Sequence, residues 1–237
     1  MKFCVIMITM NEEEPIRLQI EEIRSKTYAN IPIIIIDSSI DNTPKIAESM
    51  GVRVIRQFPP KGYGKAMKIG LLEAAKEYDA MVTLDCDMTY PAENINKFIS
   101  LLEEGWDCVS ASRLLISNKA MPLLNKLGNK LFANFVGLLF GYKTTDLTTG
   151  MRAYKSRVID SIEWVPLRFF PAELALRIHQ AGYKICEQPI EYKERIGQVK
   201  MRKVRDLLLL LQAIFYCRST PVPLKQNIHK KVKEKVK

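Results

Sequence analysis

Two carboxylates follow a run of apolar residues in the segment VTLDCDMTYP, residues 82–91. Asp85 and Asp87 form a D-x-D pair at the end of a stretch that is typical of a buried strand. Carboxylate oxygens at this spacing can bind a hard divalent cation such as Mg²⁺ or Mn²⁺. They can equally lie in a solvated loop, and the pair alone does not decide between these two interpretations.

Other stretches of the chain predict the elements that would position this pair. Apolar, β-branched runs predict five strands, and helical patterns separate them. The predicted strands are residues 2–9, 31–37, 52–56, 80–85 and 107–112, and the predicted helices are residues 12–27, 43–51, 64–78 and 91–104. This alternation predicts an α/β fold with a mostly parallel sheet covered by helices on both faces.

Polar residues follow several of these strands, and ligands of such sheets bind beyond the carboxyl ends of the strands. The residues are Thr9, Asn11, Glu12, Asp37, Ser38, Ser39, Asp41, Asp85, Asp87, Ser112 and Arg113. Acids after three strands favour a shared pocket over a solvated loop. Asp41 or Asn42 has another interpretation, because either residue could cap a helix that starts at Thr43.

Two common nucleotide-binding signatures are absent from the sequence. The glycines of KGYGKAMKIG, residues 61–70, do not have the spacing G-x-G-x-x-G, and no G-x-x-x-x-G-K-[ST] occurs. A dinucleotide oxidoreductase and a P-loop NTPase are therefore disfavoured. Lys61 and Lys65 could lie near a phosphate at the start of a helix, or they could simply be solvated.

Composition limits the chemistry further. The chain has 237 residues and 47% hydrophobic content, which suits one large domain or one domain with an appendage. Five scattered cysteines without a C-x-x-C pair, and a start at Met1 without a signal peptide, favour a cytoplasmic protein without disulfides or structural zinc. His179 and His229 are the only histidines, so a mechanism would use carboxylates, hydroxyls, basic groups or an oxygen-bound metal.

The positive charge gathers at the carboxyl end. From residue 193 onward, 13 Lys or Arg face three acids, which gives +10 and equals the net charge of the whole chain. Within this segment, residues 207–217 (LLLLLQAIFYC) are too short to span a bilayer. They predict a helix that lies in an anionic membrane interface or packs on the protein body, followed by a disordered basic tail. Nucleic-acid binding is the least favoured interpretation.

Seven segments carry a family resemblance. They are ITMNEEE, IIIIDSSIDNT, KGYGKAMKIGL, LDCDMTYPAE, SASR, DLTTGMRAYK and EQPIEYKERIGQVK. Their order and spacing resemble the family 2 inverting glycosyltransferases, most of all the polyprenyl-phosphate branch typified by dolichyl-phosphate mannose synthase. The resemblance implies a nucleotide-sugar-binding GT-A fold for residues 1–202, with residues 203–237 as an appended amphipathic helix and basic tail.

The resemblance also implies roles for the polar residues. Asp87, as a direct ligand, and Asp85, on ribose or metal, would hold Mg²⁺ or Mn²⁺ on the diphosphate of a nucleotide-sugar donor, with Thr89 near the metal. The cation would stabilise the departing nucleoside diphosphate. Residues implied to line the nucleotide pocket are Thr9, Asn11, Glu12, Asp37 on the base, and Ser39. The chain departs from the family pattern at Thr9, Met10, Ser38 and Thr89, which leaves the base and the metal shell open.

Basic residues in the second half point to the acceptor. Arg113, Arg152, Arg195 and Lys200 are expected to bind an anionic polyprenyl (dolichyl) phosphate, although Arg113 and Arg152 could form ordinary ion pairs instead. A phosphate attacks without first losing a proton, so its reaction needs no general base. Glu173 could be the base for a hydroxyl acceptor, or it could position a neighbouring arginine.

Residues 121–141 predict an amphipathic helix beside the acceptor cleft, or a plain core helix. The sequence thus predicts transfer of a hexose, mannose or glucose, from a nucleotide sugar to a polyprenyl phosphate, with inversion, at the cytoplasmic face of a membrane. The alternative acceptor is a hydroxyl of a glycan, protein or small molecule. A non-catalytic membrane- or nucleic-acid-binding module is a further alternative, which the D-x-D pair disfavours. The donor base, the sugar and the oligomeric state stay open.

Overall fold

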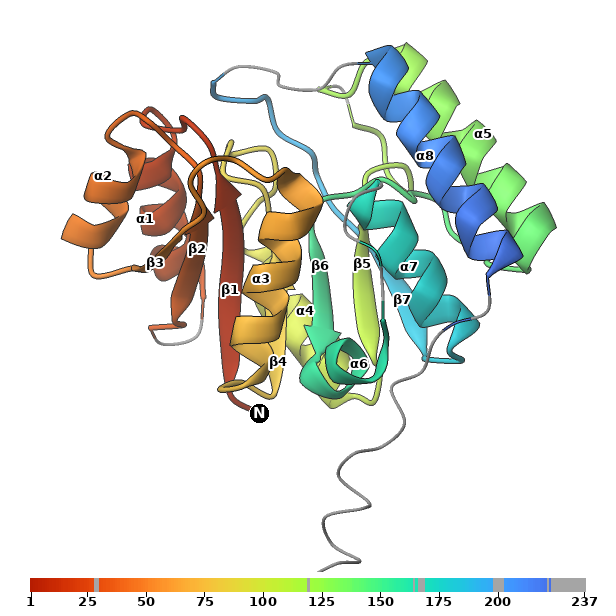
Figure 1. Cartoon of the computed structure of the whole chain (residues 1–237), viewed down its shortest axis with the longest axis horizontal. Helices are drawn as coiled ribbons and strands as arrows, with labels where there is room; N and C mark the ends of the chain where they lie inside the picture. Colours follow the sequence, from red (N-terminus) through yellow and green to blue (C-terminus); the bar gives the residue numbers. More distant parts are fainter. Residues whose placement is uncertain are drawn as a thin grey trace, which may run out of the picture.

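The computed structural model of the chain describes residues 1–27, 30–118, 120–163, 165, 169–197, 203–220 and 222. Within these residues, seven strands form one sheet (Figure 1). The strands are β1 (Phe3–Thr9), β2 (Ile33–Asp37), β3 (Arg53–Arg56), β4 (Ala80–Thr83), β5 (Cys108–Ser112), β6 (Arg152–Lys155) and β7 (Ile185–Pro189). The helices are α1 (Ile16–Lys26), α2 (Thr43–Ser49), α3 (Tyr63–Ala75), α4 (Asn94–Glu103), α5 (Leu123–Phe140), α6 (Ser156–Ser161), α7 (Phe170–Gln180) and α8 (Lys203–Ser219).

The strand order in the sheet is β3-β2-β1-β4-β6-β5-β7. β1 pairs in parallel with β2 and β4, β2 pairs in parallel with β3, and β5 pairs in parallel with β7. β6 is antiparallel to both of its neighbours, β4 and β5. The predicted α/β fold with a mostly parallel sheet is therefore confirmed, and so are the five predicted strands, each within two residues at either end. β6 and β7 were not predicted.

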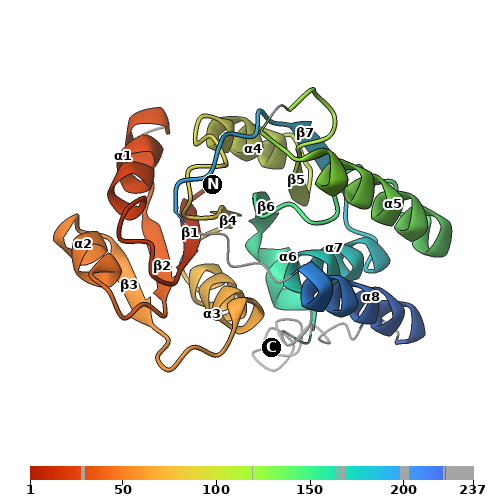
Figure 2. The same cartoon turned by 90° about the horizontal axis from the view of Figure 1, so that it is seen from above.

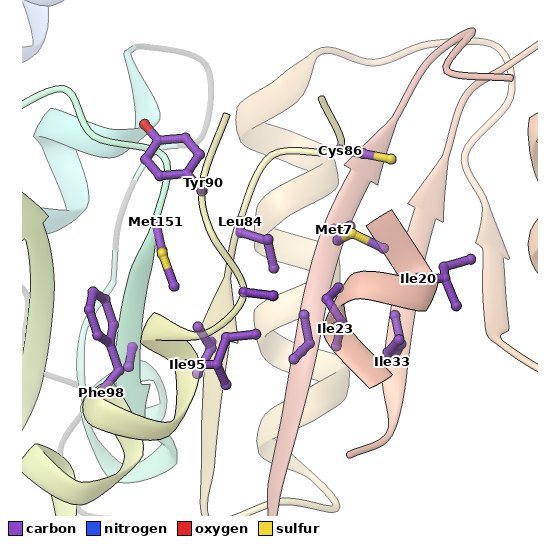
Figure 3. Close-up of a cluster of buried hydrophobic side chains, with 14 of the residues drawn as sticks. Met7, Ile20, Ile23, Ile33, Leu84, Cys86, Tyr90, Ile95, Phe98 and Met151 are labelled. Atoms are coloured by element: carbon purple, nitrogen blue, oxygen red, sulfur yellow. The ribbon is translucent and has the colours of Figure 1, made fainter. Parts of the chain in front are cut away.

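One face of the sheet is covered by α1, α2 and α4. Ile20 and Ile23 of α1 and Phe98 of α4 are buried in a cluster with the apolar residues of β1 and β2. Figure 3 shows Cys86 and Tyr90 at the end of this cluster that lies toward the carboxyl edge of the sheet. The segment that carries the two acids is therefore anchored by its own apolar residues in the core, which fixes its backbone.

The other face is covered by α3, α6 and α7, whose apolar residues pack on Cys4, Ile6, Ile34 and Ile36. Gly70 allows α3 to approach the sheet closely, because a Cβ atom there would lie 2.8 Å from Cγ2 of Ile6. This close approach brings the start of α3 to the carboxyl edge of β1 and β4.

α5 and α8 lie side by side at one end of the molecule (Figures 1 and 2). Leu210, Ile214 and Cys217 of α8 are buried in a cluster with Val136 of α5 and Leu176 of α7. The helices predicted at residues 121–141 and 207–217 are thus present, and α8 packs on the body by one face. Among the described residues, no helix combines the length and the apolar character needed to cross a bilayer.

The predicted helices at residues 12–27, 43–51, 64–78 and 91–104 correspond to α1 to α4, with α1 and α4 starting later than predicted. α6 and α7 were not predicted. Lys200 and the basic tail after residue 222 lie outside the described residues. The division of the chain at residue 202 stays a prediction.

Candidate active site

The acid pair lies at the carboxyl edge of the sheet, directly after β4. Asp87 is buried, and its Oδ1 accepts hydrogen bonds from the backbone N–H of Thr89, at 3.1 Å, and from the Thr89 hydroxyl. Its Oδ2 lies 2.7 Å from Nη1 of Arg195. Thr89, predicted near the metal, therefore acts here as a donor that orients Asp87.

The turn between Asp87 and Thr89 is held from below by α1. Met88 has φ 63°, in the left-handed region that non-glycine residues rarely adopt. Its backbone N–H donates to Oε1 of Gln19, a fully buried residue of α1, at 3.1 Å. A core side chain thus supports the unusual backbone conformation that turns the carboxylate of Asp87 toward the site.

Asp85 lies against α3 and against the loop that precedes β6. The Tyr63 hydroxyl, at the start of α3, donates to Oδ1 of Asp85 at 3.2 Å. On the other side, a Cβ atom on Gly150 would lie 2.4 Å from Oδ2 of Asp85, so a larger residue there would displace this carboxylate. Burial and the nearby Asp87 carboxylate raise the pKa of Asp85 to about 6. A cation placed between these two acids would relieve their repulsion.

The donor set of the acid pair fits a hard divalent cation that arrives with phosphate. Among the described residues, no three His, Cys, Asp or Glu side chains form a metal-binding group. Mg²⁺ typically needs no such group, because it is bound through one or two carboxylates together with substrate phosphates and water. Asp85 and Asp87 are the residues that would hold it.

The residues that follow β1 and β2 form a second polar network. Asp37 is fully buried and accepts hydrogen bonds at Oδ1 from the hydroxyls of Thr9 and Ser39, both at 2.6 Å. The N–H of Ser39 donates to Oδ2 at 3.0 Å, and Arg56 forms an ion pair with the same oxygen. The Arg56 side chain is 40% exposed, so it is the part of this network that meets solvent.

Asn11 and Glu12 connect the β1 end to the β2 end. The N–H of Asn11 donates to the Ser39 hydroxyl at 2.8 Å, and Oδ1 of Asn11 accepts from the N–H of Ile40 at 2.9 Å. The N–H of Glu12 donates to the hydroxyl of Thr43 at 2.9 Å. The predicted nucleotide-pocket residues Thr9, Asn11, Glu12, Asp37 and Ser39 are thus brought together through their hydrogen bonds.

Asp41 bonds to the first residue of α2, although the N-cap position is Asn42, whose side chain makes no capping hydrogen bond. Oδ1 of Asp41 accepts a hydrogen bond from the N–H of Thr43, the first residue of α2, at 3.0 Å, and another from the Thr43 hydroxyl. Asp41 therefore serves the local structure of α2, and its acid is not needed to explain the pocket.

Arg113 follows β5 and is held in a fixed position. Its Nε and Nη2 lie 2.6 and 2.8 Å from the two carboxylate oxygens of Asp146, and Nη2 also donates to the Thr148 hydroxyl at 3.0 Å. The guanidinium carbon lies 5.3 Å from the ring centroid of Tyr192 and 6.0 Å from that of Tyr90. Arg113 therefore forms an ion pair with Asp146, and its predicted role in binding an acceptor stays a prediction.

Arg152 and Glu173 are both buried and form hydrogen bonds with neighbouring protein groups. The buried guanidinium of Arg152 donates to the Ser110 hydroxyl at 3.1 Å and to the carbonyls of Pro171 and Leu147, both at 2.7 Å. Glu173 is fully buried in the first turn of α7, where Oε1 accepts from the N–H of Val165 at 2.7 Å. Both side chains are enclosed by these contacts, and acceptor binding by Arg152 and proton removal by Glu173 stay predictions.

Residues 192–197 cross the acid pair, and we refer to this segment as the strap. The N–H groups of Lys193 and Ile196 donate to the carbonyls of Thr89 and Asp87, both at 3.0 Å. In the view from above, this part of the chain runs from β7 across the edge of the sheet toward the end of β1 (Figure 2). The strap brings Arg195, a predicted site residue, onto Asp87.

Residues 4–162, more than half of the chain, match the family model described as Glycosyl transferase family 2. The chain belongs to glycosyltransferase family 2. A similar protein is the dolichyl-phosphate hexose transferase of Haloferax volcanii, which is 42% identical over 198 residues, 84% of this chain and 86% of that protein. The undecaprenyl-phosphate mannosyltransferase of Micrococcus luteus is 25% identical over 214 residues, 85% of this chain and 88% of that protein.

The glycosyltransferase is also similar in fold to solved structures. Glucosyl-3-phosphoglycerate synthase from Mycobacterium tuberculosis, solved in complex with Mn²⁺, uridine diphosphate and phosphoglyceric acid, superposes with a TM-score of 0.73. The match covers 93% of this chain and 79% of that chain at 18% sequence identity. It confirms the predicted GT-A fold.

Several residues that shape the site of this glycosyltransferase were not singled out from the sequence. They are Gln19, Arg56, Tyr63, Tyr90, Asp146 and Thr148. Tyr63, Tyr90, Asp146 and Thr148 lie inside segments that carried the family resemblance, so those segments were a signal for them. Gln19 and Arg56 had no such signal, because each acts through a contact with a residue far away in the sequence. Lys61 is exposed and Lys65 half-buried at the start of α3.

Proposed function

We propose that this glycosyltransferase moves a hexose from a nucleotide-diphosphate sugar to a polyprenyl phosphate, with inversion, in a reaction that depends on Mg²⁺ or Mn²⁺. The names of the two relatives, a dolichyl-phosphate hexose transferase and an undecaprenyl-phosphate mannosyltransferase, support this class of acceptor. The complex of the structural relative with Mn²⁺ and uridine diphosphate supports a donor of this type and a divalent cation.

The donor end of the reaction uses the carboxyl edge of β1, β2 and β4. Asp85 and Asp87 would hold the cation, which supplies positive charge to the leaving diphosphate when bound. Arg56, exposed above the buried Asp37, lies where the nucleoside would sit, and Lys65 lies in the first turn of α3. The anchored backbone around Met88 keeps the carboxylate of Asp87 in place, so little reorganisation is needed during the reaction.

The choice of a phosphate acceptor rests on the ion pair between Arg195 and Asp87, and it is supported by the burial of Glu173. A phosphate nucleophile is already anionic, so it needs a cation to guide it past two carboxylates and needs no base. Arg195 supplies that cation 2.7 Å from Asp87. A hydroxyl nucleophile needs an accessible base, and Glu173 is fully buried with its carboxylate bonded to the N–H of Val165.

The outer face of α5 and α8 supports a membrane as the source of the acceptor. Its exposed apolar side chains are between 44% and 84% exposed, and they are Leu123, Leu124, Leu127, Leu131, Leu138, Leu207, Leu208 and Phe215. Exposed apolar surface on this scale marks an interaction site. Lys126 and Lys130 on α5 suit an anionic surface. We infer that this face lies in the interfacial layer of the membrane.

The inner face of α5 faces the site. Oδ1 of Asn129 accepts a hydrogen bond from the Thr148 hydroxyl at 2.7 Å, and the same hydroxyl accepts one from Arg113. α5 is therefore joined to the rim of the site on one side and carries exposed leucines on the other. A lipid whose tail stays in the membrane could present its phosphate across this helix.

The test supplies radiolabelled nucleotide sugars of several bases and sugars with Mn²⁺ and either a polyprenyl phosphate or the free polyprenol. We expect label in the lipid fraction with the phosphate and at least about tenfold less with the alcohol. Equal use of the free polyprenol would overturn the acceptor assignment. No transfer to either lipid, with label appearing on a glycan or a small-molecule hydroxyl, would favour the alternative acceptor class.

A pair of variants separates the two acceptor classes at the level of residues. At saturating nucleotide sugar, so that donor binding does not limit the rate, Arg195→Ala should lower transfer to polyprenyl phosphate by about 10- to 100-fold, because a charge-assisted contact to the acceptor phosphate is lost. Glu173→Gln keeps the acceptor oxygen for the N–H of Val165 and should change transfer less than about threefold once the protein is folded. Loss of activity in the glutamine variant alone, with thermal stability unchanged, would point to a general base and to a hydroxyl acceptor.

A further inference from the structure

The strap holds the guanidinium of Arg195 against a carboxylate oxygen of Asp87 that a metal ion would use as a ligand. Both donors from Thr89 bind Oδ1 of Asp87, so this oxygen is occupied within the turn itself. Oδ2 points toward the site, and the Arg195 guanidinium lies 2.7 Å from it. A divalent cation held by Asp87 through Oδ2 therefore has to share or replace the position of Arg195.

The surroundings make this contact a strong one. Asp87 is buried, and the Arg195 side chain is 29% exposed, so the ion pair is partly shielded from water. The guanidinium of Arg195 is charged throughout the working pH range, because arginine stays protonated in proteins. Separating the pair without a substitute partner leaves a buried carboxylate and a guanidinium that have each lost a charge-assisted hydrogen bond.

The strap is anchored on both sides of Arg195 by contacts that do not involve its side chain. The N–H of Tyr192 donates to Oδ1 of the buried Asn118 at 2.6 Å, and the Tyr192 ring packs on the Tyr90 ring at 5.4 Å between centroids. On the other side, the N–H of Ile196 binds the Asp87 carbonyl. The guanidinium can therefore turn away from Asp87 while the backbone of the strap stays in place.

We propose that Arg195 is a displaceable counterion of Asp87, which hinders the binding of free Mg²⁺ or Mn²⁺ and makes metal binding depend on the nucleoside diphosphate. This inference rests on the proposed function, since it assigns the diphosphate to the acid pair. A cation that arrives alone leaves the guanidinium without an anionic partner. A cation that arrives with a diphosphate brings an anionic partner for the guanidinium, because the phosphate oxygens can accept hydrogen bonds from Arg195 in place of Asp87.

The proposal predicts opposite effects of one substitution on two binding reactions. In Arg195→Gln, the competitor of the metal is removed, so free Mn²⁺ should bind about tenfold more tightly than in the wild type. The same variant has lost a cation for the phosphates, so UDP and GDP should bind about tenfold more weakly in the presence of saturating Mn²⁺. Mn²⁺ binding is measured by electron paramagnetic resonance, and nucleotide binding by calorimetry.

Lys193→Gln is the matched control on the same strap. Its Nζ forms an exposed ion pair with Glu22 at 3.0 Å, and its backbone N–H, which binds Thr89, is kept. It removes the same formal charge from the protein without touching Asp87. We expect both binding constants of this variant to stay within about twofold of the wild type. Far-UV circular dichroism and thermal unfolding check that each variant is folded.

Two outcomes would overturn the role of Arg195. One is a folded Arg195→Gln variant whose affinity for free Mn²⁺ is unchanged or lower. The other is a gain in Mn²⁺ affinity of the same size in Lys193→Gln, since that would reflect net charge alone. If the wild type binds no nucleoside diphosphate with Mn²⁺, whether the base is uracil, guanine, adenine, cytosine or thymine, the proposed function fails at the donor, whereas the titration with free Mn²⁺ still decides what Arg195 does at Asp87.

Discussion

The two ends of the molecule present opposite kinds of surface. At the carboxyl edge of β1, β2 and β4, polar side chains such as Asp37 and Asp87 are buried and held by hydrogen bonds from their neighbours. At the end formed by α5 and α8, leucines such as Leu124 and Leu138 project from the protein, 69% and 84% exposed. The first surface is held in a fixed arrangement by the protein itself, and the second exposes apolar area that the proposed membrane contact would cover.

This difference matches the two ligands proposed for these surfaces, a nucleotide sugar and a membrane. A small charged ligand is bound best by groups whose positions are already fixed, because ordering them then costs little on binding. A membrane is fluid, so a surface that enters it needs apolar area and a few basic groups and does not need fixed geometry. Four predictions test whether the two regions are as distinct as this comparison requires.

Loss of a metal ligand should give the largest effect. Asp87→Asn keeps an oxygen that can accept from Thr89 but removes the charge that a divalent cation requires, so transfer should fall by about 10³-fold or more. EDTA should abolish transfer by the wild type, and added Mn²⁺ should restore it. The activity assay uses labelled nucleotide sugar, and vesicle binding of the variant should be unchanged. Full activity in metal-free buffer would contradict the assignment of the acid pair.

An added methyl group beside Asp85 should have the next largest effect. In Gly150→Ala the new Cβ would lie 2.4 Å from Oδ2 of Asp85, so the carboxylate must move. A shift of about 1 Å in a catalytic group can cost about 10²-fold in rate, and we expect a loss of that size in transfer. Gly128→Ala in α5 is the control, because nothing lies within 4 Å of its Cβ. Equal activity of the two variants would show that Asp85 does not need its present position.

Charges on the apolar end should affect membrane binding and spare donor binding. The double variant Leu127→Glu and Leu131→Glu should lower binding to anionic vesicles by about tenfold or more, since burial of each leucine contributes about 1.5 to 3 kcal/mol. Binding of Mn²⁺ with UDP or GDP should stay as in the wild type. Leu18→Glu on α1, 45% exposed, is the control and should leave vesicle binding unchanged. An equal loss in the control would mean that net charge, and not this face, governs the association.

The smallest expected effect is on stability. Because the pKa of Asp85 is raised to about 6, the native state disfavours its ionised form, and ionisation destabilises the protein above pH 6. In metal-free buffer at pH 7.5, Asp85→Asn should therefore unfold at a temperature roughly 2 to 4 °C higher than the wild type. The difference should shrink as pH falls from 6 to 4 and vanish below pH 4, as Asp85 becomes protonated in the unfolded state as well as in the native state. A variant that is less stable than the wild type at pH 7.5 would contradict this account.

The residues proposed to bind the donor could be predicted from the sequence because they follow strands. Thr9, Asp37 and Asp85 each end or follow a continuous apolar run, and parallel strands bring such ends to one edge. Arg152 could not be placed in this way, because β6 is only four residues long and runs antiparallel. Its guanidinium is buried against the carbonyls of Leu147 and Pro171. The polar sequence around Arg152 does not indicate that this arginine is buried.

Partners distant in sequence were also beyond prediction. The ion pair of Asp87 with Arg195 depends on the path of the strap after β7, a strand that apolar patterning did not reveal because its sequence is ICEQP. Glu173 lies in the first turn of α7, and only the packing of that helix decides that its carboxylate is enclosed. The amphipathic nature of residues 121–141 was visible, but which face points outward depends on α7 and α8.

The ion pair between Arg113 and Asp146 has a consequence for how such an enzyme can diversify. The pair joins the two ends of the segment 113–146, which contains α5. A hydrogen bond of 2.6 Å between the hydroxyls of Ser112 and Thr145 connects the same two ends. The segment between these residues is also held through Asn118, Asn129 and Tyr142, which contact Tyr192, Thr148 and His179. A chimera that carries another α5 but keeps these three side chains should therefore retain its donor chemistry while its preference for lipid changes.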